Sequence, residues 1–194
     1  KDLYMHRILI FIIIMLMSVS LSAKKKGAPA MAAGAPNDRT CLTSKCHAGN
    51  DLNTDKATIS IEGVPEVYTP NEIYEITLKL EQAGAKTWGF QATVADEEGH
   101  AMGSLIPIKG EHIKLHDQAR YKSKTDRQYL THTLAGIKGP KKGKSPTWKF
   151  QWQAPDSASS SSSFYFAFNA GNGNKKKTGD YIYTRSVTVA AEKK

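Results

Sequence analysis

Two cysteines and a histidine lie close together near the start of the chain, and these are the residue types best suited to chemistry. The chain has only two cysteines, Cys41 and Cys46, and His47 directly follows the second. A Cys-x-x-Cys-His motif marks covalent attachment of a c-type haem, because the two thiols bond the ring and the adjacent imidazole binds the iron. Here four residues, 42–45, separate the cysteines instead of two. The cluster therefore indicates a haem c site with an extended spacer.

The same cluster is compatible with other structures. In an oxidising compartment Cys41 and Cys46 would form a disulfide, which would close a small loop and add modest stability. A zinc site needs about four ligands, and no second cysteine pair or paired histidine motif completes one. Haem attachment, a disulfide and an incidental surface His47 all remain open from these three residues alone.

An iron bound by His47 would take its second axial ligand from elsewhere in the chain. The favoured distal ligand is His132, although its alternation with Leu130 and Leu134 is equally typical of a buried core histidine. Met102, in a glycine-rich turn, is the alternative, and a methionine ligand would raise the reduction potential. The remaining candidates are three further histidines: His100, His112 and His116.

Short segments with alternating hydrophobic residues must position these side chains. A period of two is typical of a strand with one buried face. It recurs at residues 59–61, 74–80, 88–94, 130–134, 148–152, 164–168 and 181–189. Turn residues separate these segments, and no long amphipathic helix is indicated. The pattern predicts an all-β fold, an antiparallel β-sandwich, with Trp88, Trp148 and Trp152 in its core.

The N-terminus predicts export. An apolar run from Ile8 to Met17 follows His6-Arg7 and precedes small residues that end at Ala23, which are the three parts of a secretory signal peptide. The run is shorter than the roughly 20 residues that cross a bilayer, so we expect cleavage and no stable membrane span afterwards, with an uncleaved N-terminal anchor as the alternative. The predicted organisation is a signal peptide (1–23), a flexible leader (24–40), a haem-attachment segment (41–50) and a sandwich domain (51–190).

Charge and the remaining polar residues narrow the classes of function. The net charge of +9 favours an acidic partner or an anionic surface. No basic helix is indicated, so nucleic-acid binding is not expected. No nucleophile with a base and no phosphate loop is present, so we expect no enzyme, with a haem enzyme or gas sensor as the exception.

Four residues would suit a cation site, but turn chemistry is favoured for them: Asn169, Asn172, Asn174 and Asp180.

Several segments, in the same order, resemble the bacterial choice-of-anchor V family, whose sandwich is similar to the animal Reeler domain. The resemblance covers roughly residues 34–189 and opens with Gly34-Ala35-Pro36-Asn37 and the cysteine–histidine segment, where the family has Cys-x-x-Cys-His. The later matching segments are Tyr68–Tyr74, Trp88–Gln91, Tyr129–Thr133, Trp148–Pro155 and Thr178–Thr184. The four-residue spacer between the cysteines departs from the family's pattern.

The resemblance implies an exported monohaem cytochrome-like protein with a Reeler or immunoglobulin-like sandwich. It implies haem c held by Cys41 and Cys46, with His47 as the proximal iron ligand. It further implies electron transfer to a redox partner protein of the cell envelope, in the periplasm or at the cell surface. The alternative is a non-enzymatic Reeler-like surface or adhesion module with a Cys41–Cys46 disulfide and no haem.

Overall fold

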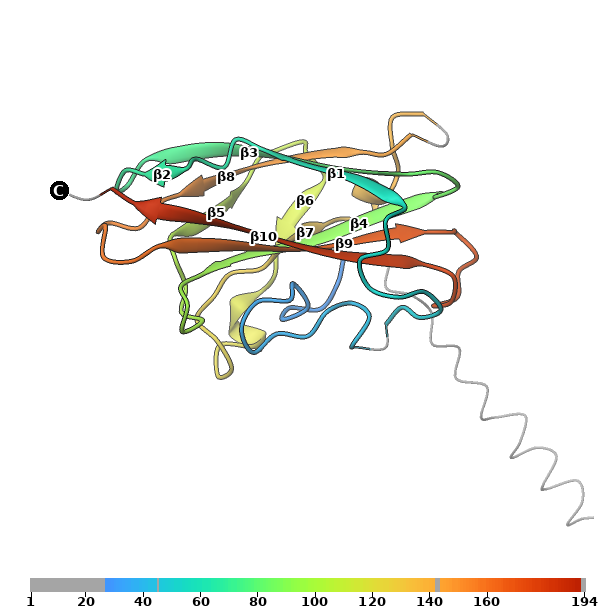
Figure 1. Cartoon of the computed structure of the whole chain (residues 1–194), viewed down its shortest axis with the longest axis horizontal. Helices are drawn as coiled ribbons and strands as arrows, with labels where there is room; N and C mark the ends of the chain where they lie inside the picture. The colour runs from blue at the N-terminus through green and yellow to red at the C-terminus, as the bar shows by residue number, and fades with distance from the viewer. Residues whose placement is uncertain (1–26, 45, 142–143, 193–194) are drawn as a thin grey trace, which may run out of the picture.

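Two stacked β-sheets make up the domain (Figure 1). The computed structural model describes residues 27–44, 46–141 and 144–192. The first sheet has the order β1 (Ala57–Glu62), β3 (Ile73–Gln82), β8 (Thr147–Gln153) and β5 (Ser104–Pro107). The second has the order β2 (Val67–Tyr68), β10 (Tyr181–Ala191), β9 (Ser162–Gly171), β4 (Thr87–Ala95), β7 (Leu130–His132) and β6 (Ile113–Leu115). The predicted β-sandwich is therefore confirmed.

The sequence alternation places large side chains between the sheets. On β9, Phe164, Phe166 and Phe168 are fully buried and stack along the strand. Fully burying such a side chain contributes about 1.5–3 kcal/mol, so this strand alone supplies a large part of the core. The three tryptophans predicted to be buried are at most 3% exposed: Trp88, Trp148 and Trp152.

The sheets differ from the sequence-based expectation in two details. The short β2 pairs with β10 in parallel, so the sandwich is not wholly antiparallel. The stretch 104–128, which lacks a clear period, contains β5, β6 and the 3-10 helix η1 (Gln118–Arg120). A second 3-10 helix, η2 (Ala135–Ile137), begins three residues after the end of β7.

The segment before the cysteines packs on the outer face of the six-stranded sheet (Figure 1). The buried side chain of Gln91 on β4 holds it: Gln91 Oε1 accepts the Ala32 N–H at 2.7 Å, and Gln91 Nε2 donates to the Pro29 carbonyl at 2.8 Å. Ala32 and Ala33 are each only 1% exposed. The described residues 27–40, which belong to the segment predicted as a flexible leader, thus pack on the sheet through small alanines.

A buried ion pair also fastens this segment. Arg127 Nη2 donates to Asp38 Oδ1 at 2.8 Å, and the Tyr129 hydroxyl donates to the same oxygen at 2.7 Å. Burial raises the pKa of Asp38, although Tyr129 and Arg127 oppose that effect. Removing one partner of a buried pair costs about 3–5 kcal/mol, because the other charge is left without compensation. The pair therefore fixes the chain three residues before Cys41.

The predicted signal peptide, residues 1–23, lies outside the described residues. Within the part of the chain that the structure describes, no helix has both the length and the apolar character needed to cross a bilayer.

Candidate functional site

Cys41 and Cys46 lie beside the six-stranded sheet as free thiols. The side chain of Cys41 is buried against Ala32 and Ala167, and its thiol lies 3.9 Å from the Ala32 carbonyl oxygen. Burial, with a smaller effect of Cys46, raises the pKa of the Cys41 thiol to about 12. The Cys46 side chain is half-buried and its thiol lies 3.7 Å from the Ser44 carbonyl oxygen. The structure thus contains no Cys41–Cys46 disulfide.

The segment that follows is tied to the loop between β9 and β10. The Ala48 N–H donates to the Lys177 carbonyl at 2.6 Å, and the Gly179 N–H donates to the Ala48 carbonyl at 2.9 Å. Asn50 Nδ2 donates to the Asp180 carbonyl at 3.0 Å. These contacts join the start of the domain to its last strand and fix the backbone that carries His47.

A buried carboxylate orients the His47 imidazole. His47 Nδ1 donates to Asp180 Oδ2 at 2.7 Å, and the Asp180 side chain is 6% exposed. Asp180 is itself held by the Asn172 N–H, which donates to Oδ1 at 3.0 Å. Histidine ligands of metals commonly donate their second ring nitrogen to a carboxylate, which fixes the ring and raises its basicity. The other ring nitrogen, His47 Nε2, faces Asn169, whose Nδ2 lies 3.5 Å away.

His132 approaches the same region from another strand. It is the last residue of β7, and its Nδ1 lies 3.0 Å from the Phe90 nitrogen and 3.1 Å from the Phe90 oxygen. The Phe90 N–H donates to Nδ1 in one tautomer, which carries its proton on Nε2. The other tautomer donates from Nδ1 to the Phe90 oxygen and leaves Nε2 unprotonated, which is the form that binds a metal. The ring lies directly over Gly89, where a Cβ atom would be 2.5 Å from His132 Cε1. Glycine at position 89 is therefore required by the histidine.

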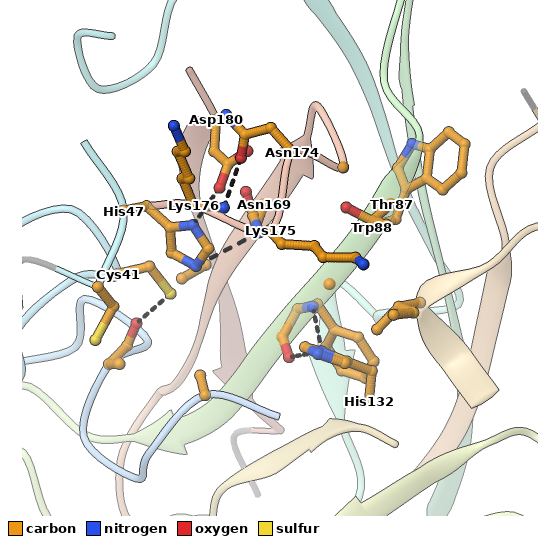
Figure 2. A pocket seen from close by; sticks show the side chains of 18 of the residues that line it. Cys41, His47, Thr87, Trp88, His132, Asn169, Asn174, Lys175, Lys176 and Asp180 are labelled. Atoms are coloured by element: carbon orange, nitrogen blue, oxygen red, sulfur yellow. Dashed lines mark hydrogen bonds and ion pairs between the residues drawn. The ribbon is translucent and has the colours of Figure 1, made fainter. Parts of the chain in front are cut away.

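One pocket brings these side chains together. Cys41, Cys46, His47 and His132 all line a cavity of about 200 Å³ on the outer face of the six-stranded sheet. In Figure 2, Cys41 and His47 lie on one side of this pocket and His132 lies across from them. Burial, with His47 among the smaller causes, lowers the pKa of His132 to about 4, so this imidazole is neutral at pH 7.

The lining fits a haem in its chemistry. Two thiols, one carboxylate-anchored imidazole and a second neutral imidazole are the groups that attach and ligate a c-type haem. Apolar side chains complete the wall, including Trp88, Phe90 and Ile137. The cavity is smaller than the roughly 300–1,000 Å³ of typical ligand sites. A bound haem would therefore have to widen the pocket or keep one edge in solvent.

The other sequence-predicted ligands do not line this pocket. Met102 lies in the core beside Trp152, whose indole N–H donates to the Met102 carbonyl at 3.0 Å. His100 forms an exposed pair with Asp96 at 3.2 Å. With Glu98 these two side chains make an exposed group of metal-ligating type in the turn after β4. The two remaining histidines are also outside the lining: His112 and His116.

Three features of the pocket are not predicted from the sequence. Asp180 was assigned only to turn chemistry, yet it anchors His47 across 133 positions of sequence. Gly89 makes room for His132. Lysine side chains also line the pocket: Lys138, Lys175 and Lys176. Asp180 and Gly89 fall within the segments Thr178–Thr184 and Trp88–Gln91, which the sequence analysis used only for the family resemblance.

No protein-family model and no curated protein matches the chain. Among solved structures it is similar to the Reelin-N domain of F-spondin, at 14% identity and a TM-score of 0.49 over 76% of this chain and 93% of that one. It is also similar to the reeler domain of human F-spondin, at 14% identity and a TM-score of 0.49 over 75% and 94%. A structure of AvmM, which catalyses macrocyclisation in alchivemycin A biosynthesis, has 13% identity and a TM-score of 0.44 over 74% and 92%.

Proposed function

We propose that this chain is an exported monohaem c-type cytochrome-like protein that transfers electrons. Cys41 and Cys46 would hold the haem covalently, with His47 and His132 as its axial ligands. The observation that carries the proposal is that His132, far from the cysteine–histidine motif in sequence, lines the same pocket as the motif. Export follows from the N-terminal sequence pattern, and the resemblance to choice-of-anchor V sandwiches agrees with both parts of the proposal.

The residues prepare the pocket for an iron with two nitrogen ligands. When bound, the haem would supply the one-electron chemistry. Asp180 holds His47 with Nε2 available, and Phe90 holds His132 by its Nδ1 atom. Haem proteins with both axial positions filled by protein ligands are suited to electron transfer rather than to binding small molecules at the iron. This arrangement favours an electron carrier over a haem enzyme or gas sensor.

A haem stain tests the proposal directly. The full chain is exported in a host that has c-type haem maturation machinery, boiled, and run on a denaturing gel. We expect a haem-stained band, and a mass increase of one haem in intact-mass measurement. The Cys41→Ser/Cys46→Ser variant should lose both signals, because no thioether bond can form. An unstained wild-type band at the unmodified mass would overturn the proposal.

Absorbance spectra then test the two axial ligands. The reduced wild type should not bind carbon monoxide, whereas His132→Ala should keep its covalent haem and bind it. His112→Ala is the matched control, because His112 does not line the pocket. Carbon monoxide binding to the reduced wild type would instead indicate an open iron site, as in an enzyme or sensor.

A haem-free result would leave the other reading of the chain, a non-enzymatic Reeler-like surface or adhesion module. A disulfide in such a module would appear in intact-mass measurement as the loss of two hydrogens. It would require the two thiols, which are free in the structure, to come within bonding distance of each other.

A further inference from the structure

Positively charged side chains at the pocket are left without counter-ions. Three lysines line it and are exposed: Lys138, Lys175 and Lys176. Within the described residues, none of them forms an ion pair. The carboxylate in the lining belongs to Asp180, which already pairs with His47. The pocket therefore has an excess of positive charge that a bound ligand could neutralise.

The lysine with the clearest orientation is Lys175. Its side chain extends across the pocket and ends near Thr87 and Trp88, on the opposite side from Cys41 (Figure 2). Lys138 directly follows Ile137 at the end of η2 and also lines the pocket. The Lys175 ammonium group thus lies on a different side of the cavity from Cys41, whereas Lys176 lies on the side of His47 (Figure 2).

The loop that carries Lys175 is ordered by side-chain hydrogen bonds. The Asn174 N–H donates to Asn172 Oδ1 at 3.0 Å, and the Lys176 N–H donates to Asn174 Oδ1 at 2.7 Å. Both asparagine side chains also donate to the Thr178 carbonyl, at 3.1 and 2.9 Å. Asx turns of this kind fix the backbone locally. These bonds fix the backbone of the loop that carries Lys175.

The polar and apolar groups of a haem are distributed in a way that matches the lining of the pocket. Its vinyl groups, which bond the cysteines, lie on the part of the ring away from its two propionate carboxylates, and the ring between them is apolar. Carboxylates at the edge of a partly apolar site need charged hydrogen-bond donors, because desolvating them without partners is costly. The pocket offers the Cys41 thiol on one side, apolar lining residues, and the Lys175 ammonium group on the other side (Figure 2).

We propose that Lys175 and Lys138 bind the propionate groups of the haem, so that the haem lies with its thioether edge at Cys41 and Cys46 and its propionate edge toward Thr87 and η2. This inference rests on the proposed function, since it assigns an orientation to the haem of that site. It gives the lysines a role in positioning the cofactor rather than in general solubility.

The reduction potential as a function of pH tests this assignment in the haem-loaded protein. Lys175→Gln and Lys138→Gln should retain the haem, which is held covalently, but should have a lower potential than wild type at pH 8. Their potential should then rise as the pH falls toward 5, because a propionate without its ammonium partner takes up a proton in this range. In wild type and in Lys175→Arg, which keeps the charge, the reduction potential should change less with pH than in the two glutamine variants.

Lys109→Gln is the matched control. Lys109 is an exposed lysine in the turn between β5 and β6 that does not line the pocket, so its profile should follow that of wild type. Profiles of Lys175→Gln and Lys138→Gln that coincide with wild type, with the haem retained, would overturn the orientation while leaving the haem itself intact. A wild-type protein without haem would overturn the proposed function instead.

Discussion

The substitution Gly89→Ala tests the close contact between β4 and the His132 ring. The added Cβ atom would lie 2.5 Å from His132 Cε1, 3.0 Å from Nδ1 and 3.1 Å from Nε2. Overpacking of this kind costs about 1–3 kcal/mol, and loss of the buried contact between His132 and Phe90 adds about 1 kcal/mol. Replacing a glycine within a strand by alanine stabilises the folded protein by roughly 0.5–1 kcal/mol, which offsets part of this cost. We therefore expect a net destabilisation of about 1–3 kcal/mol.

The assay is urea unfolding of the haem-free protein, followed by tryptophan fluorescence, in a double-mutant cycle. In the His132→Ala background the Cβ atom at position 89 meets no ring, so Gly89→Ala should be neutral or stabilising by about 0.5–1 kcal/mol. The coupling free energy between the two positions should thus be about 1–4 kcal/mol. Equal costs of Gly89→Ala in both backgrounds would refute the placement of the ring, and with it the geometric basis for His132 as the distal ligand.

Three further predictions concern the haem-free protein. At pH 8, iodoacetamide should modify Cys46 far faster than Cys41. The rise in the pKa of the Cys41 thiol from 9.0 to about 12 lowers its thiolate fraction by about a thousandfold. Equal modification rates, measured by peptide mass mapping, would contradict this. Gln91→Ala should destabilise by about 1–3 kcal/mol, since it leaves buried groups of the leading segment without partners, and limited proteolysis should cut residues 28–40 sooner than in wild type. Folding lowers the pKa of His132 from 6.5 to about 4, so between these pH values the unfolded chain binds a proton that the folded protein does not. The free energy of unfolding should therefore fall by up to about 3 kcal/mol as the pH drops from above 6.5 to 4. His132→Gln should lose less over that range in urea titrations, and an equal loss would show that other groups are responsible.

The strands could be predicted because their signal is local. Alternation on β3 and β8 reflects burial on one face, and the structure buries the expected side chains. On β4 the pattern is hidden, since eight of its nine residues are buried. One face of β4 contacts the core, and the other is covered by residues 28–32, which no period in the sequence reveals.

The site was predictable only where its residues are adjacent in sequence or share a recognisable motif. Cys41, Cys46 and His47 form such a motif, and His132 lies in a segment that the family resemblance singled out. Asp180 could not be assigned to His47, because a short polar residue beside glycine is common in turns. Met102 was plausible from its glycine-rich surroundings, but its side chain packs in the core.

The tie between His47 and Asp180 has a consequence for the order of folding. The two residues lie 133 positions apart, near opposite ends of the domain. Contacts of such large sequence separation form slowly, because the entropy of closing the intervening chain must be offset first. The pocket should accordingly be among the last parts of the domain to assemble. Until β10 joins the sheet, the motif would remain an open peptide with both thiols within reach of a modifying enzyme.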